Sequence, residues 1–383
     1  MNFDKKSTVR ITCPIGLSRL LKKETEELGF TPLVTEETGI ELQASLNECM
    51  VLNFRLRTAH RVHYLLGQKK INNEQALYEW ANSFPWEEII PQEGFFSVTS
   101  RISHPSITND QFANVRVKDA VVDRMRAKTG SRPDSGPDLT GTVLFVYWDQ
   151  DVARLFLDTS GESLSRRNYR TRDVAAPMQE TLAAAIIKTT KWEPGWHMIN
   201  PMAGGGTLAI EAAMIATNRA PAMLRHQFGF MHLIGYDESV YQSIRESAKK
   251  AAQASINSKI IVTDNSPTAL LAAKKNAETA GVHHLMEFET CDVADTPVPE
   301  GDGIIVVNPP YGIRLDSRDD LRPLYKKIGD FFKSEGAGKW GYVFTGNQAL
   351  GKKVGLRTSS KTTFFNTTIE CRLLEYELYS GRK

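Results

Sequence analysis

The four residues from Asn308 to Tyr311 (NPPY) follow four consecutive β-branched residues, 304–307 (IIVV), which are typical of a strand buried on both faces. Proline has no backbone N–H, fixes its own φ and disfavours helix in the residue before it. Pro309 and Pro310 therefore predict a stiff turn that holds two acceptors, the Asn308 amide oxygen and the Pro309 carbonyl, beside the Tyr311 ring. This arrangement suits an exocyclic amino group on a planar ring that stacks on the tyrosine. A plain proline turn is the alternative.

A glycine-rich turn and two aspartates follow other predicted strands. The turn, 200–207 (NPMAGGGT), lacks both the GxGxxG spacing and the lysine of a phosphate-gripping loop, so neither kind of nucleotide site is indicated. Asp264 ends the segment 258–264, where its carboxylate could accept both hydroxyls of a ribose or cap the next helix. Asp292 ends the segment 285–292, where it could accept from an adenine amino group.

Regular alternation of strands and helices from about residue 177 onward positions these motifs. It predicts an open, doubly wound, mostly parallel sheet with a C-terminal antiparallel pair of strands and an insertion at 218–258. In such sheets ligands bind at the carboxyl ends of the strands, where the strand order reverses. The glycine turn, both aspartates and the NPPY motif all lie at such ends, so we expect one shared site.

The first half of the chain predicts a different architecture. Short strands and helices mix between residues 7 and 158, which indicates an α+β fold in two small units that meet near residues 60–70. We expect one helix over 46–67, a second over 111–130 that ends at Gly130, and a hairpin over 141–161.

Charge and composition exclude several classes of protein. The formal net charge is only +2, but three basic stretches, 116–128, 165–172 and 351–361, make a nucleic-acid-binding stripe plausible beside the simpler reading of solvated faces. No run of about 18 apolar residues predicts a membrane span, and the N-terminus lacks the apolar core of a signal peptide. The four cysteines have no CxxC spacing, so we expect reduced thiols, no metal site and a cytoplasmic location.

Four stretches carry a family resemblance: 157–170 (LDTSGESLSRRNYR), 176–187 (APMQETLAAAII), 200–221 (NPMAGGGTLAIEAAMIATNRAP) and 308–317 (NPPYGIRLDS). Together they resemble the RlmL type of class I S-adenosylmethionine-dependent RNA methyltransferase, a THUMP-domain family that methylates guanine N2 in ribosomal RNA. The resemblance implies a ferredoxin-like segment at 1–65, a THUMP RNA-binding domain at 66–165 and a Rossmann-like catalytic domain at 166–383. It also implies one methyl mark, from one catalytic domain.

The chain departs from the family at one motif. The family's Asp, Cys and Ser are replaced by Asn200, Ala203 and Gly205. Losing the carboxylate could weaken a polar contact to the methionine part of the cofactor.

The resemblance implies a role for each motif. Asn308 and the Pro309 carbonyl would hold the target amino group, and two acceptors on its hydrogens would turn the nitrogen lone pair toward the methyl group. Catalysis would then be mainly alignment and charge complementarity. The catalytic residues implied are Asn308, Pro309, Pro310 and Tyr311. Those for S-adenosylmethionine are Asn200, Pro201, Met202, Ala203, Gly204, Gly206, Thr207, Asp264, Asn265, Asp292 and Val293. The basic stretches at 116–128 and 165–172 predict the residues that contact RNA, which are Arg116, Lys118, Arg166, Arg167, Arg170 and Arg172.

Three other functions remain open. A transfer RNA guanine-N2 methyltransferase shares the THUMP architecture. An adenine-N6 methyltransferase of DNA or RNA shares the NPPY motif, although the first half of the chain shows no helix-turn-helix or target-recognition repeat. An RNA-binding ribosome assembly factor with an inactive methyltransferase fold would fit the altered glycine turn.

Overall fold

The computed structural model describes residues 1–103, 110–172, 178–312 and 320–379. Residues 176–177 and 313–317, which belong to two of the motif stretches above, lie outside the described residues. The chain forms two compact units. The first comprises Met1–Cys13, Leu21–Leu164 and Arg225–Ser247, and the second comprises Pro14–Leu20, Ser165–Leu224 and Ala248–Lys383.

The strands of the first unit form one eight-stranded sheet in the order β2-β3-β1-β4-β8-β7-β5-β6. The central strand β4 pairs antiparallel with β1 on one side and with β8 on the other. A single sheet therefore runs through both small α+β regions, and the predicted boundary at residue 65 falls inside β4. The strands are β1 Ser7–Thr12, β2 Val34–Glu36, β3 Gly39–Ala44, β4 Arg61–Lys70, β5 Phe95–Ser103, β6 Asp134–Ser135, β7 Thr142–Asp149 and β8 Val152–Asp158.

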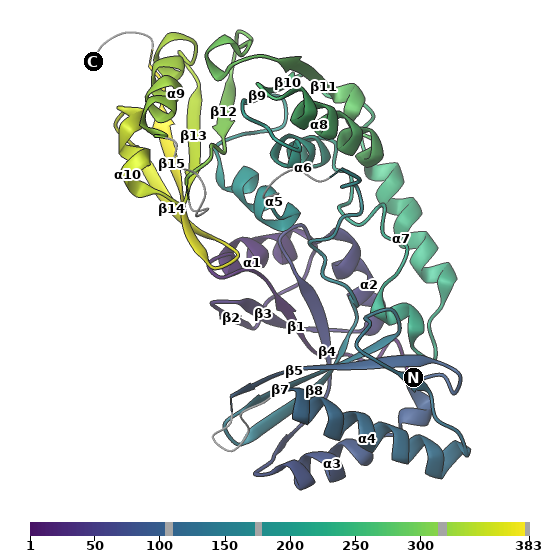
Figure 1. Ribbon diagram of the computed structural model, residues 1–383. Coiled ribbons are helices and arrows are strands. Elements are labelled where there is room, and N and C mark those ends of the chain that lie inside the picture. Colours follow the sequence, from purple (N-terminus) through teal and green to yellow (C-terminus); the bar gives the residue numbers. More distant parts are fainter. Residues whose placement is uncertain (104–109, 173–177, 313–319, 380–383) are drawn as a thin grey trace. The chain divides into compact units, whose positions relative to one another are not determined.

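The helices of this region are α1 Ser18–Glu27, α2 Leu46–Arg55, α3 Glu74–Asn82 and α4 Asp110–Thr129, with short 3-10 turns η1 Trp86–Glu88 and η2 Gly229–His232. Helices α3 and α4 lie side by side, and α4 packs against β5 (Figure 1). On α4, Val117, Val121 and Met125 recur every four residues and are fully buried. They form the apolar stripe that fixes which face of α4 remains in solvent.

The prediction of one helix over 46–67 is wrong. Helix α2 ends at Arg55, and β4 begins at Arg61. Short apolar runs fit a strand and a helix equally well, and here pairing on both sides decides the outcome. His63, in the middle of β4, is buried against the Phe145 ring of β7, with ring centroids 4.4 Å apart.

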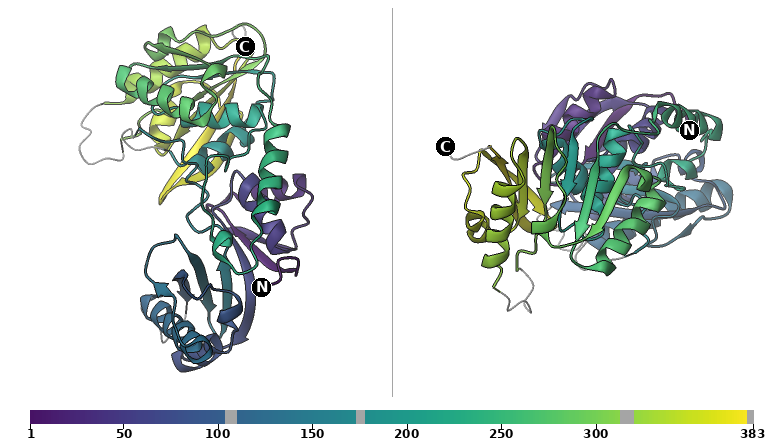
Figure 2. Two further views of the ribbon diagram at one scale, coloured as in Figure 1. Left: turned by 90° about the vertical axis from the view of Figure 1, so that its right-hand side faces the viewer. Right: turned by 90° about the horizontal axis from the view of Figure 1, so that it is seen from above.

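The second unit contains the predicted doubly wound sheet, in the order β11-β10-β9-β12-β13-β15-β14. The five strands from β11 to β13 pair parallel, and β15 pairs antiparallel with β13 and with β14. The yellow C-terminal hairpin forms one edge of this sheet (Figure 2). The strands are β9 His197–Asn200, β10 Ile260–Asp264, β11 Met286–Thr290, β12 Gly303–Val307, β13 Trp340–Thr345, β14 Ser360–Asn366 and β15 Ile369–Glu377.

Helices of the second unit cover this sheet. Residues 304–307 of β12 are fully buried, as predicted, and Ile305 and Val307 pack in one cluster with Tyr325 and Ile328 of α9. Helix α6 packs against α5, α8, β9 and β10. The helices are α5 Glu180–Thr189, α6 Thr207–Ala216, α8 Pro267–Ala280, α9 Arg322–Ser334 and α10 Gln348–Gly351, with 3-10 turns η3 His283–Leu285, η4 Val293–Asp295 and η5 Lys352–Val354. Helix α7, Glu238–Ala251, belongs mostly to the first unit.

Two findings concern the whole described chain. Part of the predicted insertion, Arg225–Ser247, belongs by its contacts to the first unit, which the sequence did not indicate. None of the helices within the described ranges is long and apolar enough to span a membrane.

Candidate functional site

The strand order of the second sheet reverses between β9 and β12, because the chain adds β10 and β11 on one side and β12 and β13 on the other. The carboxyl ends of β9 and β12 therefore border the crevice where α/β sheets bind ligands. Asn200 is the last residue of β9, and Asn308 directly follows β12. The structure thus brings the glycine turn and the NPPY motif to neighbouring strand ends.

Asn200 joins these two ends. Its side chain is 1% exposed, and its Nδ2 donates a hydrogen bond to the Val306 carbonyl at 2.9 Å. An aspartate could not donate this bond, which gives the amide in place of the family's carboxylate a structural reason. The other amide atom, Oδ1, is buried and accepts no hydrogen bond from any described residue. It is therefore available to a donor on a ligand.

The glycine turn between β9 and α6 is held by its own backbone and by β10. The Ala203 N–H donates to the Thr263 carbonyl at 3.0 Å, and the Gly206 N–H donates to the Ala203 carbonyl at 2.9 Å. Gly206 has a φ of 77°, and a Cβ there would lie 2.9 Å from the Cβ of Ala273 on α8. Both the backbone conformation and the close approach of α8 therefore require glycine at this position.

Asp264, at the end of β10, fastens the glycine turn. Its carboxylate accepts from the Gly204 N–H and from the Ser266 N–H, both at 2.9 Å. The cap of α8 is Ser266, whose side chain accepts from the Ala269 N–H. Asp264 is therefore not the helix cap itself. Its oxygens retain lone pairs for further donors, and its contact with a ribose remains a prediction, as does that of the exposed Asn265.

Asp292, beyond the end of β11, already has two partners. Its carboxylate accepts from the Ala294 N–H at 3.0 Å and from the Lys327 ammonium of α9 at 2.9 Å. The backbone hydrogen bond, followed by Lys327, lowers the pKa of Asp292. The neighbouring Val293 is buried in the cluster beneath the sheet. An adenine contact at Asp292 would have to share a carboxylate that links two elements.

The NPPY motif leaves one acceptor without a partner. The Asn308 side chain is half-buried, and its Oδ1 is buried with no donor among the described residues. Pro309 is buried and Pro310 is exposed. The Tyr311 hydroxyl accepts a hydrogen bond from Asn366 Nδ2 at 2.9 Å. A buried, unpaired acceptor is costly, so Asn308 has the property that a site awaiting a donor requires.

Asn276 on α8 was not indicated by the sequence. It is 2% exposed, and its Nδ2 donates to the Gly205 carbonyl of the glycine turn at 3.1 Å. Its Oδ1 accepts from the backbone N–H groups of Thr171 at 3.0 Å and Arg172 at 3.3 Å. One buried amide thus ties the glycine turn to residues 165–172, here called the arginine strap. A lone asparagine inside a helix gives no signal of such a role.

The arginine strap was predicted to contact RNA, but two of its four arginines are paired inside the protein. Arg167 is 2% exposed, with Nε 3.5 Å from the Glu211 carboxylate of α6. The hydroxyl of Tyr169 donates to the same carboxylate at 3.1 Å. Arg170 lies 3.2 Å from the Glu180 carboxylate of α5. Buried or paired, Arg167 and Arg170 do not suit phosphate contacts, whereas Arg166 and Arg172 are exposed.

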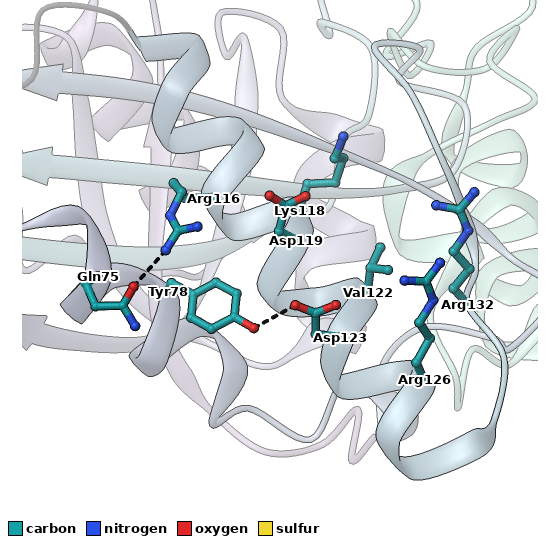
Figure 3. A pocket seen from close by; sticks show the side chains of 9 residues that line it. All are labelled: Gln75, Tyr78, Arg116, Lys118, Asp119, Val122, Asp123, Arg126 and Arg132. Carbon is teal, nitrogen blue, oxygen red and sulfur yellow. Dashed lines mark hydrogen bonds between the residues drawn. The ribbon is translucent and has the colours of Figure 1, made fainter.

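A hollow of about 450 Å³ on α3 and α4 contains the other predicted RNA contacts (Figure 3). The Arg116 guanidinium lies 4.8 Å from the centre of the Tyr78 ring and donates to Gln75 Oε1 at 2.9 Å. Lys118, Arg126 and Arg132 form no ion pair with any described residue. This cationic hollow is lined by Gln75, Tyr78, Arg116, Lys118, Asp119, Val122, Asp123, Arg126 and Arg132.

Three family models match the chain in sequence order. An RlmL ferredoxin-like domain matches residues 8–63, a THUMP domain matches 72–158, and an RMKL-like methyltransferase domain matches 167–375. The last of these covers more than half of the chain and includes the glycine turn, Asp264 and the NPPY motif. The resemblance stated from the motifs is thereby confirmed, as is the predicted fold class.

Individual relatives agree with the family models. The chain is 35% identical over 381 residues to the ribosomal RNA large subunit methyltransferase K/L of Syntrophotalea carbinolica, covering 97% of this chain and 53% of that protein. The chain thus spans about half the length of the curated relatives it matches.

Solved structures resemble the whole chain. The crystal structure of SMU.472 complexed with SAH has a TM-score of 0.88 at 25% identity and covers 100% of both chains. A structure from Listeria monocytogenes str. 4b F2365, described as a predicted N6-adenine-specific DNA methylase, has a TM-score of 0.87 at 29% identity and covers 99% of this chain and 97% of that one. From its sequence, its strand order and these matches, the chain belongs to the family of RMKL-like methyltransferase domains, with an RlmL ferredoxin-like domain and a THUMP domain before the catalytic one.

Proposed function

We propose that this chain is an S-adenosylmethionine-dependent RNA methyltransferase that methylates the exocyclic N2 of a guanine in 23S ribosomal RNA. The observation that carries the proposal is the buried, unpaired Asn308 oxygen at the carboxyl end of β12, beside the end of β9 where the strand order reverses. The names of the curated relatives support ribosomal RNA as the substrate. Such a substrate agrees with the cytoplasmic location expected from the thiols.

The residues around the glycine turn fit the cofactor. The unpaired Asn200 oxygen suits the ammonium of its methionine part, and the spare lone pairs of Asp264 suit its ribose hydroxyls. Gly204, where an added Cβ would meet no atom within 4 Å, keeps the turn free of a side chain where the ligand would pass. When bound, S-adenosylmethionine supplies a methyl group on a positively charged sulfonium. The SAH complex of the neighbouring structure supports this assignment.

The NPPY motif would hold the target base. The Asn308 oxygen and the Pro309 carbonyl each accept a hydrogen bond from the amino group. These two bonds favour a pyramidal nitrogen, whose lone pair then points toward the methyl group. Tyr311 stacks on the base. The chain then contributes alignment and a preorganised pair of acceptors, without an obligatory strong base. A base paired in an RNA helix must first be extruded, which the stiff prolines favour by holding the acceptors ready.

The cationic hollow would contribute RNA affinity. Its cations Lys118, Arg126 and Arg132, which form no ion pair with any described residue, suit phosphate oxygens, and phosphate contacts supply affinity without reading sequence. The exposed Arg166 and Arg172 are further candidates, whereas Arg167 and Arg170 are not.

The test is methyl transfer from labelled S-adenosylmethionine to ribosomal RNA from cells that lack this gene, with the product nucleoside identified by mass spectrometry. N2-methylguanosine in 23S RNA is the expected product. Methylation of transfer RNA instead would reassign the substrate, and N6-methyladenine in RNA or DNA would reassign the base. RNA binding without cofactor binding by calorimetry would identify an assembly factor with an inactive fold.

A further inference from the structure

The hairpin of β14 and β15 extends past the end of its neighbour β13. Thr345, the last residue of β13, pairs with Arg372 of β15, so β15 has three further residues before it, 369–371, with no partner on β13. On β14 they pair with 364–366. Strands rise about 3.3 Å per residue, so the hairpin projects roughly 10 Å beyond the sheet.

This projection lies at the edge of the sheet where the carboxyl ends of the parallel strands meet. β15 is antiparallel to β13 and to β14, so β14 runs in the same direction as β12 and β13. Its last residue, Asn366, therefore lies at the same edge as Asn308, although β13 and β15 separate β14 from β12 in the sheet. Tyr311 lies four residues beyond the end of β12, where it can meet the hairpin across the shorter β13.

A hydrogen bond between side chains joins Tyr311 to the hairpin. Asn366 Nδ2 donates to the Tyr311 hydroxyl oxygen at 2.9 Å. The Tyr311 ring is half-buried, and burial is the largest cause of its raised pKa, so the hydroxyl keeps its proton at neutral pH. The buried Cys371 of β15 is next to the same hydroxyl. Hairpin contacts thus hold the far end of the ring, while the NPPY backbone holds its near end.

We propose that Asn366 is a positioning residue that fixes the Tyr311 ring in the orientation in which it stacks on the target base. Asn366 does not touch the reacting atoms. It holds the hydroxyl end of the ring and so restricts its swing about the Cα–Cβ bond, which otherwise would have to be restricted when the base arrives, and such preorganisation favours the productive complex. The inference rests on the proposed function, because it assigns a role within the same site.

The experiment compares Asn366→Ala with Thr368→Ala, an exposed residue of the same turn that serves as the matched control. Losing one hydrogen bond predicts a roughly two- to tenfold fall in kcat/KM for RNA. The S-adenosylmethionine affinity and the thermal midpoint should stay unchanged, as should all properties of Thr368→Ala. Asn366→Asp should keep the activity that Asn366→Ala loses, because the Tyr311 hydroxyl can then donate a hydrogen bond to the carboxylate.

Tyr311→Phe supplies the second arm. It removes the same bond from the other side, so it should reproduce Asn366→Ala, and the double variant should be no slower than either single one. Additive losses, or an Asn366→Ala enzyme as fast as the control, would overturn the inference while the wild type still methylates RNA. Failure of the proposed function is distinct, because the wild type would then transfer no methyl group to guanine.

Discussion

The arginine strap and the cationic hollow have similar compositions but opposite environments. In the strap, Arg167 and Arg170 meet carboxylates that α6 and α5 present to them. In the hollow, Arg126 and Arg132 face solvent without an ion pair to any described residue. The first pair of arginines stabilises the fold around the glycine turn, and the second pair remains available to a partner.

This difference shows that the role of a cation depends on whether a neighbouring helix presents a carboxylate to it. A buried charge is tolerated only with a partner, and Glu211 supplies it from a helix whose other residues are nearly all apolar. Burial also raises the pKa of Glu180, despite the opposing effect of Arg170. The same criterion applies to acceptors. Asn276 is fully partnered and holds the turn, whereas Asn308 has an unpaired oxygen and is the candidate for chemistry.

The largest effect is expected from Arg167→Ala. It leaves Glu211 buried without its cation, and breaking a buried pair typically costs about 3–5 kcal/mol of the free energy of unfolding. Arg126→Ala, in the cationic hollow and exposed, should change it by less than about 0.5 kcal/mol. Urea unfolding followed by circular dichroism measures both. Equal stabilities of the two variants would remove the distinction between strap and hollow.

Asn308→Ala should have the next largest effect, on the chemical step. It removes one of two preorganised acceptors, and such a loss typically lowers the rate about a hundred- to a thousandfold. Asn308→Asp retains an acceptor of the same size and should keep partial activity. Single-turnover methyl transfer, with cofactor affinity measured in parallel, tests both. If Asn308→Ala turned over at a near-normal rate, the unpaired oxygen would be no sign of function.

The sequence predicted the second unit well because its physical signals are local. A buried β-branched run before two prolines, glycines between strand and helix, and acids after strands all specify where a strand ends. The helix predicted over 46–67 failed because a strand that pairs on both sides can resemble a helix in its apolar content.

Local signals of this kind do not predict contacts between residues that are far apart in the sequence. Nothing near Asn276 or Asn366 in the sequence indicates the Gly205 carbonyl or the Tyr311 hydroxyl to which they donate. Glu211 does carry a signal in the sequence. A carboxylate inside an apolar helix requires a buried cation, which assigns one arginine to the core.

Asp264→Ala should weaken S-adenosylmethionine binding about ten- to a hundredfold, since a hydrogen bond to a charged group contributes roughly 1.5–3 kcal/mol. Asp264 also holds the Gly204 N–H, so it combines the two roles that the comparison separates. Ser266→Ala is the control, because it removes the α8 cap at a cost of about 1 kcal/mol in stability without touching the ligand. Calorimetric titration measures the S-adenosylmethionine affinity of both variants. Unchanged affinity in Asp264→Ala would leave this residue with its structural role alone.

The smallest effect is expected in the cationic hollow. Removing one cation that binds a phosphate should make the slope of log affinity against log salt shallower by roughly 0.7–0.9. Arg126→Gln and Arg132→Gln should therefore each weaken RNA binding severalfold at low salt and leave the rate at saturating RNA unchanged. Arg124→Gln, on the same helix as Arg126, is the matched control because its guanidinium donates two hydrogen bonds to the Glu87 carboxylate, at 3.0 and 2.6 Å. The removed charge is the same, so net charge cannot explain a difference between them. Equal salt slopes in all three variants would show that an unpaired cation of the hollow is no more available to RNA than a paired one.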